Sequence, residues 1–379
     1  MAFPVIDIRE VTLFRVRKEL VHEFETSSHR KNYIEHVLIK ATTRDGLVGW
    51  GEAASPSDPF YCYESTDTCW HVLRTYLVPT LLAGTFETPE DALVASPVTG
   101  NPFAHAASDM VMWDLFAQQQ GLALADVLGG TQAEVNAGVS LGIEKSIDDL
   151  LAVVAHHVAD GYRRVKLKIS PNWAYEPAKA VREAFPDVAV QVDANASFRS
   201  NDVDSSLFND LDGLGLLMIE QPFGMDDLLS HAALARRLAT PICLDESITS
   251  IDTLRTALHL EAASIINIKV SRLGGVGPAR HVHDACFEAG VPVWCGGMHE
   301  FGVGRAANLA VASLPGFTYP SDLSGSAKYY ATDLVEPELR AHDGFVTVPR
   351  GRSGLGLTVL EDRVRAEALD VVRLDANQL

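Results

Sequence analysis

Five short apolar segments of the chain each end in an ionisable residue, and these residues are its clearest candidates for chemistry. In chain order they are Lys168, Asp193, Glu220, Asp245 and Lys269. The steps between them are 25, 27, 25 and 24 residues, a length that suits one strand plus one crossover helix. The spacing therefore predicts a repeated strand–helix unit built around a parallel sheet.

Closure of such a sheet into a barrel would bring the strand ends together. The carboxyl ends of the strands then meet at one mouth, where barrels of this kind carry their active sites. Three facing carboxylates repel one another unless a cation balances them, and oxygen ligands suit Mg²⁺. Asp193, Glu220 and Asp245 are therefore predicted metal ligands, although each one alone also fits an ordinary turn or helix-cap carboxylate.

Three lysines accompany these carboxylates. Lys168 ends the second predicted barrel strand and Lys269 the sixth, so in a closed barrel they approach the mouth from opposite sides. Neighbouring cations destabilise an ammonium group, which allows such a lysine to remove a proton at neutral pH. Lys166 shares a strand face with Lys168 and could stabilise an anionic oxygen. A lone Lys-x-Lys pair would instead fit a solvated strand edge.

Length and composition define the class of protein. A chain of 379 residues is long enough for a full barrel and a smaller domain. A formal net charge of −19 argues against a nucleic-acid partner. No apolar run reaches the roughly 18 residues of a membrane span, and residues 1–9 do not resemble a signal peptide. Five cysteines without a CxxC pair indicate reduced thiols, and we expect a cytoplasmic protein without a membrane partner.

The chain before about Gly130 has a different pattern from the rest. It predicts an antiparallel meander and two helices, over residues 6–16, 34–43, 47–52, 64–82 and 104–119. Thr88 and Pro89 predict the start of another helix. We expect an α/β protein with three ranges: an α+β capping domain (1–130), a (β/α)7β TIM-type barrel (131–335) and a C-terminal segment that returns to the capping domain (336–379).

Further barrel elements follow from the same patterns. The first, seventh and eighth barrel strands are expected at residues 135–143, 291–297 and 316–322, with helices at 280–289 and 304–313. Beyond Pro337 the strand–helix rhythm ends. Residues 344–348 and 356–360 are expected to return to the N-terminal domain.

Six motifs together resemble a known family. They are Lys166-Leu167-Lys168, Asp193-Ala194-Asn195, Glu220-Gln221-Pro222, Asp245-Glu246-Ser247, Asn267-Ile268-Lys269 and Gly296-Gly297-Met298. This set resembles the muconate-lactonising subgroup of the enolase superfamily, and more closely its N-acylamino acid (N-succinylamino acid) racemases and o-succinylbenzoate synthases. The resemblance covers about residues 6–360. It implies Mg²⁺ as the cofactor, with Mn²⁺ or Co²⁺ as substitutes, a small-molecule carboxylate substrate and a homo-oligomer.

The resemblance also implies a role for each matching residue. The metal ligands would be Asp193, Glu220 and Asp245, and the catalytic lysines Lys168 and Lys269, with Lys166 holding the substrate carboxylate. The implied substrate-binding residues are Ser140, Asn195, Arg272, Gly297, Met298 and His299, with Glu246 and Glu300 as polar neighbours of the site. Arg272 matches an arginine that tends to accompany racemase activity, and an ion-pair partner is an equal alternative for it.

The implied reaction is racemisation of N-acylated, above all N-succinyl, amino acids. One lysine would take the α-proton and the other return it, through a metal-stabilised enediolate. If a β-hydroxyl departs instead, the same intermediate gives o-succinylbenzoate, a step of menaquinone synthesis, and one protein can have both activities. A non-catalytic ligand-binding relative is a third alternative, and muconate cycloisomerases or dipeptide epimerases are others within the subgroup.

Two segments depart from the family pattern. After Gly-Gly-Met the family usually has Ile or Leu, then Glu, then Thr or Ser, whereas here His299 and Phe301 occupy the outer two positions. The loop over residues 24–31, which covers the active site in the family, lacks the usual Phe-Gly after Thr-Ser. Both changes bear on the acyl group and side chain of the substrate. His299 would either contact a substrate carboxylate or serve as a structural histidine.

Overall fold

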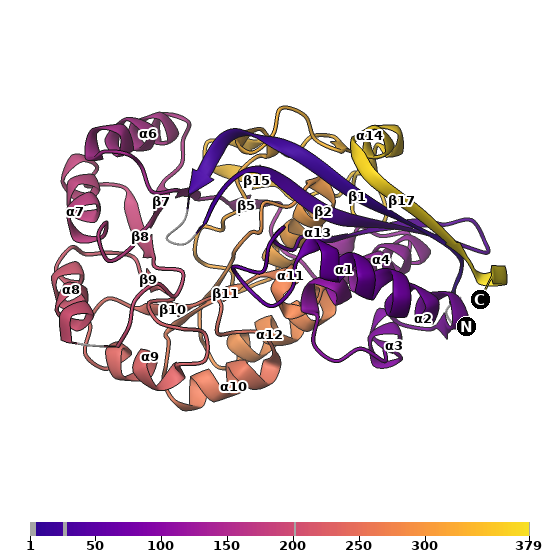
Figure 1. The fold of residues 1–379 in the computed structure, drawn as a ribbon, viewed down its shortest axis with the longest axis horizontal. Coiled ribbons are helices and arrows are strands. Elements are labelled where there is room, and N and C mark those ends of the chain that lie inside the picture. Colours follow the sequence, from indigo (N-terminus) through magenta and orange to yellow (C-terminus); the bar gives the residue numbers. More distant parts are fainter. Residues whose placement is uncertain (1–4, 26–28, 201, 379) are drawn as a thin grey trace.

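The computed structural model describes residues 5–25, 29–200 and 202–378. An antiparallel sheet with its helices lies beside a parallel sheet surrounded by helices (Figure 1). One large core cluster contains side chains of both sheets, for example Phe14 and Trp50 of the first and Val165 and Ile268 of the second. This shared core packs the two parts against each other.

The N-terminal sheet confirms the predicted meander. Its strand order is β17–β1–β2–β3, with antiparallel neighbours throughout. The strands are β1 (Ile6–Glu25), β2 (Arg30–Thr43), β3 (Val48–Ala53) and β17 (Ala368–Asp375), and a short β4 (Thr85–Phe86) pairs with β1. β1 and β2 run well beyond the predicted lengths. The far end of β1 reaches the parallel sheet, where the Glu25 carbonyl accepts a hydrogen bond from Ile143 N at 3.1 Å.

Helices cover one side of this N-terminal sheet. They are α1 (Thr66–Val72), a π-helical turn (Leu73–Leu77), α2 (Val78–Ala83), α3 (Pro89–Val94), α4 (Pro102–Gln119) and α5 (Leu124–Leu128). As predicted, Thr88 caps α3 by accepting from Asp91 N at 3.3 Å. α4 lies directly on β3, where a Cβ on Gly51 would overlap the Ala107 carbonyl oxygen. Glycine at this position therefore permits the close packing of α4.

The second sheet consists of seven parallel strands in consecutive order from β6 to β12. They are β6 (Val139–Leu141), β7 (Arg164–Lys168), β8 (Ala189–Asp193), β9 (Ile219–Glu220), β10 (Ile242–Leu244), β11 (Ile265–Ile268) and β12 (Val293–Cys295). The helices around it are α6 (Ile147–Ala159), α7 (Tyr175–Ala184), α8 (Asp202–Asp212), α9 (Leu228–Ala235), α10 (Ile251–His259), α11 (Val270–Leu273), α12 (Val276–Glu288) and α13 (Gly302–Ala312). In the strand pairing, Lys168 lies beside Asp193, and Asp193 lies beside Glu220. The residues spaced about 25 apart in the sequence are therefore neighbours at the ends of adjacent strands.

The prediction of one strand over residues 135–143 is wrong. β5 (Glu134–Asn136) pairs antiparallel with β15, and β6 pairs separately with β7. Gly138 lies at the break between them, where a Cβ would overlap the Arg164 guanidinium. The buried Arg164 side chain thus occupies the space that a side chain at position 138 would need.

The predicted eighth strand, residues 316–322, is not a regular strand. It makes isolated parallel bridges, Phe317 with Val293 and Ser321 with Ala137. Pro320 in its middle has no N–H to donate, and its carbonyl accepts from Arg164 Nη2 at 2.6 Å. The two bridges nevertheless join this segment to both edges of the seven-stranded sheet, so the barrel closes irregularly.

The C-terminal region contains β13 (Val335–Glu336), β14 (Ala341–His342), β15 (Phe345–Thr347), β16 (Thr358–Val359) and α14 (Glu361–Glu367). Residues 344–348 and 356–360, expected to return to the N-terminal domain, form short strands that do not join the N-terminal sheet. β15 pairs with β14 and β5, and β16 pairs with β13. β17, which the sequence patterns did not single out, pairs with β1 instead.

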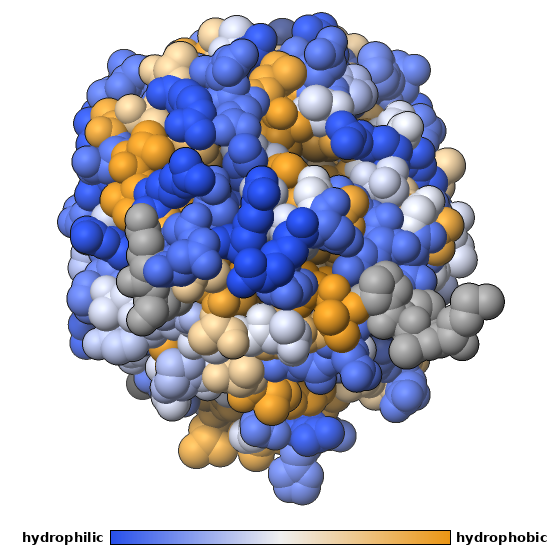
Figure 2. All heavy atoms as spheres, turned by 90° about the vertical axis from the view of Figure 1, so that its right-hand side faces the viewer, coloured by the Kyte–Doolittle hydropathy of each residue, from blue (hydrophilic) through white to orange (hydrophobic). Residues whose placement is uncertain are grey.

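Helix length, the cysteines and the surface of the described residues bear on membrane spans, disulfides and apolar patches. In the part of the chain that the structure describes, no helix is long and apolar enough to cross a membrane. All five cysteines are free thiols. On the face that lies on the right in Figure 1, hydrophilic side chains predominate and apolar ones gather in separate places (Figure 2). The division into ranges 1–130, 131–335 and 336–379 and the homo-oligomer stay predictions.

Candidate active site

The carboxyl ends of β7, β8 and β9 hold a buried network of lysines and carboxylates. Lys168 Nζ lies 2.6 Å from Asp193 Oδ2 and donates to Asn195 Oδ1 at 2.7 Å. Lys166 Nζ lies 3.2 Å from Asp193 Oδ2 and 3.1 Å from Glu220 Oε2. Both lysines reach the same carboxylate because residues two apart on a strand share a face. The structure thus brings these five predicted site residues together.

A second group lies at the ends of β10 and β11. Lys269 Nζ is 2.7 Å from Asp245 Oδ2 and donates to Tyr61 Oη at 3.1 Å. Arg272 contacts the other oxygen of Asp245 through Nη1, and its remaining donors bind the carbonyls of Ile248 and Asn267. Arg272 is thus an ion-pair partner of Asp245 in this structure.

Amide side chains donate hydrogen bonds to the carboxylates of Glu220 and Glu246. Glu220 accepts from Gln191 Nε2 and from Asn267 Nδ2, both at 2.8 Å. Asn195 donates to Glu246 Oε1 at 2.9 Å and has a left-handed backbone, with φ 44°, which asparagine tolerates better than most residues. Gln191 and Asn267 are completely buried, so these bonds lie away from water.

Of the other predicted site residues, some line a cavity beside the network and others lie outside that lining. Gly297, Met298 and His299 line a cavity of about 80 Å³, together with Lys168, Lys269 and Asn195. Ser140 lies beside Lys166 in the sheet register and is not part of that lining. Glu300 is buried and accepts from Met298 N at 2.9 Å, so it supports the loop after β12.

Arg272 and Glu246 line a different space. A cavity of about 700 Å³ extends from these two residues to α3, α4 and the loop after β9. It shares Tyr61 with the smaller cavity. Glu246 and Arg272, which contact Asn195 and Asp245, therefore lie between the network of strand-end residues and this larger cavity.

His299 and Phe301, which depart from the family pattern, have different surroundings. The His299 ring stacks on Tyr329 at 4.6 Å and meets the edge of Phe24 at 4.7 Å. Burial, with nearby cations, lowers the His299 pKa well below its usual value, so the ring is neutral. Phe301 is fully buried and packs against His36 at 5.1 Å, outside the cavity lining. Of the 24–31 loop, residues 26–28 lie outside the described residues.

Burial and charge oppose each other at the lysines. Burial disfavours the Lys166 ammonium, but Asp322 and two further carboxylates outweigh it and raise the pKa of Lys166. Burial likewise opposes the charge of Lys269, and Tyr61 with neighbouring carboxylates raises its pKa. Burial alone would raise the pKa of Asp193, but its two lysines hold that pKa below the usual value. Lys166, Lys269 and Asp193 are therefore charged and paired in this structure.

The donor chemistry of the strand-end carboxylates fits a divalent cation. Asp193, Glu220 and Asp245 are buried and offer only oxygen. Their ligand atoms do not all lie within 4.8 Å of one another, and Asp245 contacts Lys269 and Arg272. In this structure, lysine and arginine side chains neutralise the three carboxylates in place of a metal ion. The carboxylate oxygens would have to move closer to one another to bind a single cation.

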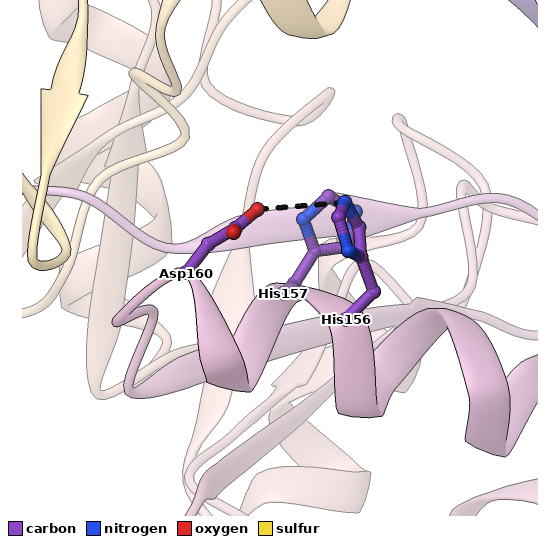
Figure 3. Close-up of side chains that lie close together, drawn as sticks. All are labelled: His156, His157 and Asp160. Atoms are coloured by element: carbon purple, nitrogen blue, oxygen red, sulfur yellow. Dashed lines mark ion pairs between the residues drawn. The ribbon is translucent and has the colours of Figure 1, made fainter.

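A second group of candidate metal ligands lies at the end of α6. Within the described residues, the set with ligand atoms mutually within 4.8 Å is His156, His157 and Asp160 (Figure 3). His156 Nε2 lies 3.5 Å from Asp160 Oδ2, and both side chains are mostly exposed. Burial, with the charge of Lys328, lowers the pKa of His157 to about 4. Because a positive neighbour opposes a metal ion, we interpret this group as a surface ion pair.

Sequence reasoning missed two residues of the network. Asp322 Oδ2 lies 2.6 Å from Lys166 Nζ, and its Oδ1 accepts from Arg164 Nη1 at 2.7 Å. Asp322 is the last residue of the predicted eighth strand. It could therefore have been found from the sequence in the same way as Asp193, Glu220 and Asp245, as an ionisable residue at a strand end. Tyr61 lies in the loop after β3, where no periodicity marks a residue.

Comparison with known families covers most of the chain. Residues 149–363 match the family described as enolase C-terminal domain-like. Residues 8–129 match the N-terminal domain of the mandelate racemase / muconate lactonizing enzyme family.

Individual relatives are similar over nearly the full length. An o-succinylbenzoate synthase of Geobacillus stearothermophilus is 44% identical over 363 residues, 96% of each chain. An N-succinylamino acid racemase of Amycolatopsis is 45% identical over 360 residues, 93% of this chain and 95% of the relative. The crystal structure of an enolase superfamily member from Listeria innocua has a TM-score of 0.93 at 33% identity, covering 98% of this chain and 100% of that one. This similarity confirms the predicted fold class.

Proposed function

The chain belongs to the mandelate racemase / muconate lactonizing enzyme family of the enolase superfamily, among its N-acylamino acid racemases and o-succinylbenzoate synthases, and we propose that it racemises N-acylated amino acids. The main support is that Lys168 and Lys269, from distant strands of the sheet, line the same cavity. N-succinyl amino acids are the proposed substrates, because one of the similar relatives is named for acting on them.

The two lysines account for inversion at the α-carbon. Lys168 enters the cavity from β7 and Lys269 from the end of β11, and the intervening strands β8 to β10 separate them in the sheet. An α-carbon held between them would face one amine on each side. Removal of the proton by one lysine and its return by the other inverts the configuration.

Asp193, Glu220 and Asp245 would hold a divalent cation, Mg²⁺ by donor type, with Mn²⁺ or Co²⁺ as substitutes. When bound, such a cation supplies a Lewis acid that stabilises negative charge on the substrate carboxylate. Lys166, buried between Asp193 and Glu220, adds a fixed positive charge at the same place. Lys168 and Lys269, which now neutralise Asp193 and Asp245, would then be free to exchange protons.

Dehydration to o-succinylbenzoate is the second candidate function. Relatives with either name are about equally similar to this chain, at 44% and 45% identity. Both reactions begin with removal of a proton next to a carboxylate, so the same lysines and the same cation site serve either one. They differ in whether the proton returns or a hydroxyl leaves.

A substrate panel distinguishes the two functions. The Mg²⁺-loaded protein is offered N-succinyl-L-phenylalanine, its D-enantiomer and, separately, the hydroxylated precursor of o-succinylbenzoate. We expect the optical rotation of both enantiomers to decay to zero. Formation of the aromatic product without any loss of rotation would make the protein a synthase, and no reaction with any of the three would contradict both proposals.

A further inference from the structure

Lys31 places a positive charge in the wall of the smaller cavity. It lies on β2, half-buried, and its side chain lines the cavity together with Lys168 and Lys269. Within the described residues it has no hydrogen bond from its ammonium group and no ion pair. An ammonium group held partly away from water without a partner is unfavourable unless a ligand supplies the opposite charge.

The other formal charges in this lining are balanced. Glu35, the acidic residue of the lining, binds Arg15 at 2.5 Å and Arg17 at 2.6 Å. Lys168 and Lys269 are paired with carboxylates of the strand-end network. Lys31 is therefore the formal charge of the lining that has no partner among the described residues.

The histidines of the lining do not change this balance at neutral pH. Burial lowers the pKa of His29, and burial with the charge of Lys31 lowers the pKa of His36 to about 3. Burial also lowers the pKa of Lys31 itself to about 8, a shift that Lys168 and Lys269 increase and Glu300 opposes. Lys31 thus stays mostly protonated at pH 7 and lies within the electrostatic influence of both lysines.

Strand geometry directs Lys31 into the cavity. At the start of β2, Lys31 and Tyr33 lie on one face of the strand and both line the cavity, as does His29 just before it. Further along β2 the lining includes Ile34, Glu35 and His36. Arg30, between the first two, pairs with Glu23 and is more than half exposed. The chain therefore provides a cation facing the cavity and, next to it, a cation facing solvent.

We propose that Lys31 forms a binding subsite for a second carboxylate of the substrate, remote from the carboxylate next to the reacting carbon. This inference rests on the proposed function, because it assumes that the α-carboxylate lies at Lys166 and the strand-end carboxylates. The second carboxylate has two possible sources: the end of a dicarboxylic N-acyl group such as succinyl, or the side chain of an acidic amino acid. In either case the substrate is a dianion.

Calorimetric binding to the Mg²⁺-loaded protein tests the subsite without requiring turnover. Three ligands separate the sources of charge: N-succinyl-L-phenylalanine, N-acetyl-L-glutamate and N-acetyl-L-phenylalanine. We expect the wild type to bind one of the two dianions more tightly than the monoanion. Lys31→Gln should reduce this preference roughly 30-fold or more, the loss that corresponds to removing one partner of a desolvated charge pair. Lys31→Arg should restore most of it.

The adjacent residue supplies the control. Arg30→Gln removes the same charge from the same hairpin on the solvent side, and the ratio of dissociation constants should stay within about twofold of the wild type. An equal loss of preference in both variants would overturn the subsite, as would an unchanged preference in Lys31→Gln. Failure of the wild type to bind any dianion would overturn it too, whereas tight, Lys31-dependent binding without racemisation would contradict only the proposed function.

Discussion

Asp193 pairs with two of the buried lysines of the active site. Its Oδ2 is 2.6 Å from Lys168 and 3.2 Å from Lys166, so one oxygen neutralises part of two buried ammonium groups. A cation bound there would displace Lys168 from its carboxylate. Asp193 is thus both a proposed metal ligand and the ion-pair partner of one proposed base.

Tyr61 has a comparable relation to the other proposed base. Its hydroxyl accepts from Lys269 Nζ at 3.1 Å, and the ammonium also lies 4.9 Å from the ring centroid. Tyr61→Phe keeps the ring and removes that hydrogen bond. We expect kcat for racemisation to fall about 10-fold to 100-fold with little change in KM, because a hydrogen bond to a charged group is worth about 1.5–3 kcal/mol.

The neighbouring Tyr63 is the control for this measurement. Its side chain is 86% exposed, so Tyr63→Phe should leave kcat unchanged. A fall in KM and kcat together for Tyr61→Phe, with a lower melting temperature, would show that Tyr61 supports the loop rather than positions Lys269.

At the scale of elements, the strand ends were predictable and the loops were not. Lys168, Asp193 and Glu220 lie side by side because they end consecutive parallel strands, and a regular period records that arrangement in the sequence. Tyr61 and Lys31 come from the N-terminal part and reach the cavity only through its packing on the barrel. Contacts of this kind leave no periodic pattern, so local sequence reasoning does not detect them.

The packing of α4 on β3 gives a prediction about stability. Gly51→Ala should lower the free energy of unfolding by about 1–3 kcal/mol, because the added Cβ overlaps the Ala107 carbonyl oxygen and the backbone must shift. Chemical denaturation measures this difference. Gly224→Ala is the control, since a Cβ there meets no atom within 4 Å, and equal destabilisation by both substitutions would contradict the packing argument.

For the whole molecule, metal binding and stability are linked. Asp193, Glu220 and Asp245 come from three strands, so a cation that bridges them binds only the folded chain. We expect Mg²⁺ at about 100 times its dissociation constant to add about 2.7 kcal/mol to the free energy of unfolding. The gain should disappear with EDTA and in Glu220→Gln. An equal gain in that variant would place the ion elsewhere.

If Lys168 and Lys269 exchange the α-proton from different sides of the substrate, each lysine alone should exchange the proton of one enantiomer, which hydrogen exchange in D₂O measures. Proton NMR follows N-succinyl-L- and D-phenylalanine separately with the wild type, Lys168→Ala and Lys269→Ala. We expect the wild type to exchange and racemise both enantiomers. Each variant should lose racemisation by a factor of about 10² to 10⁴ and still exchange the proton of one enantiomer, opposite for the two variants. Exchange of both enantiomers by either variant would contradict the two-lysine account.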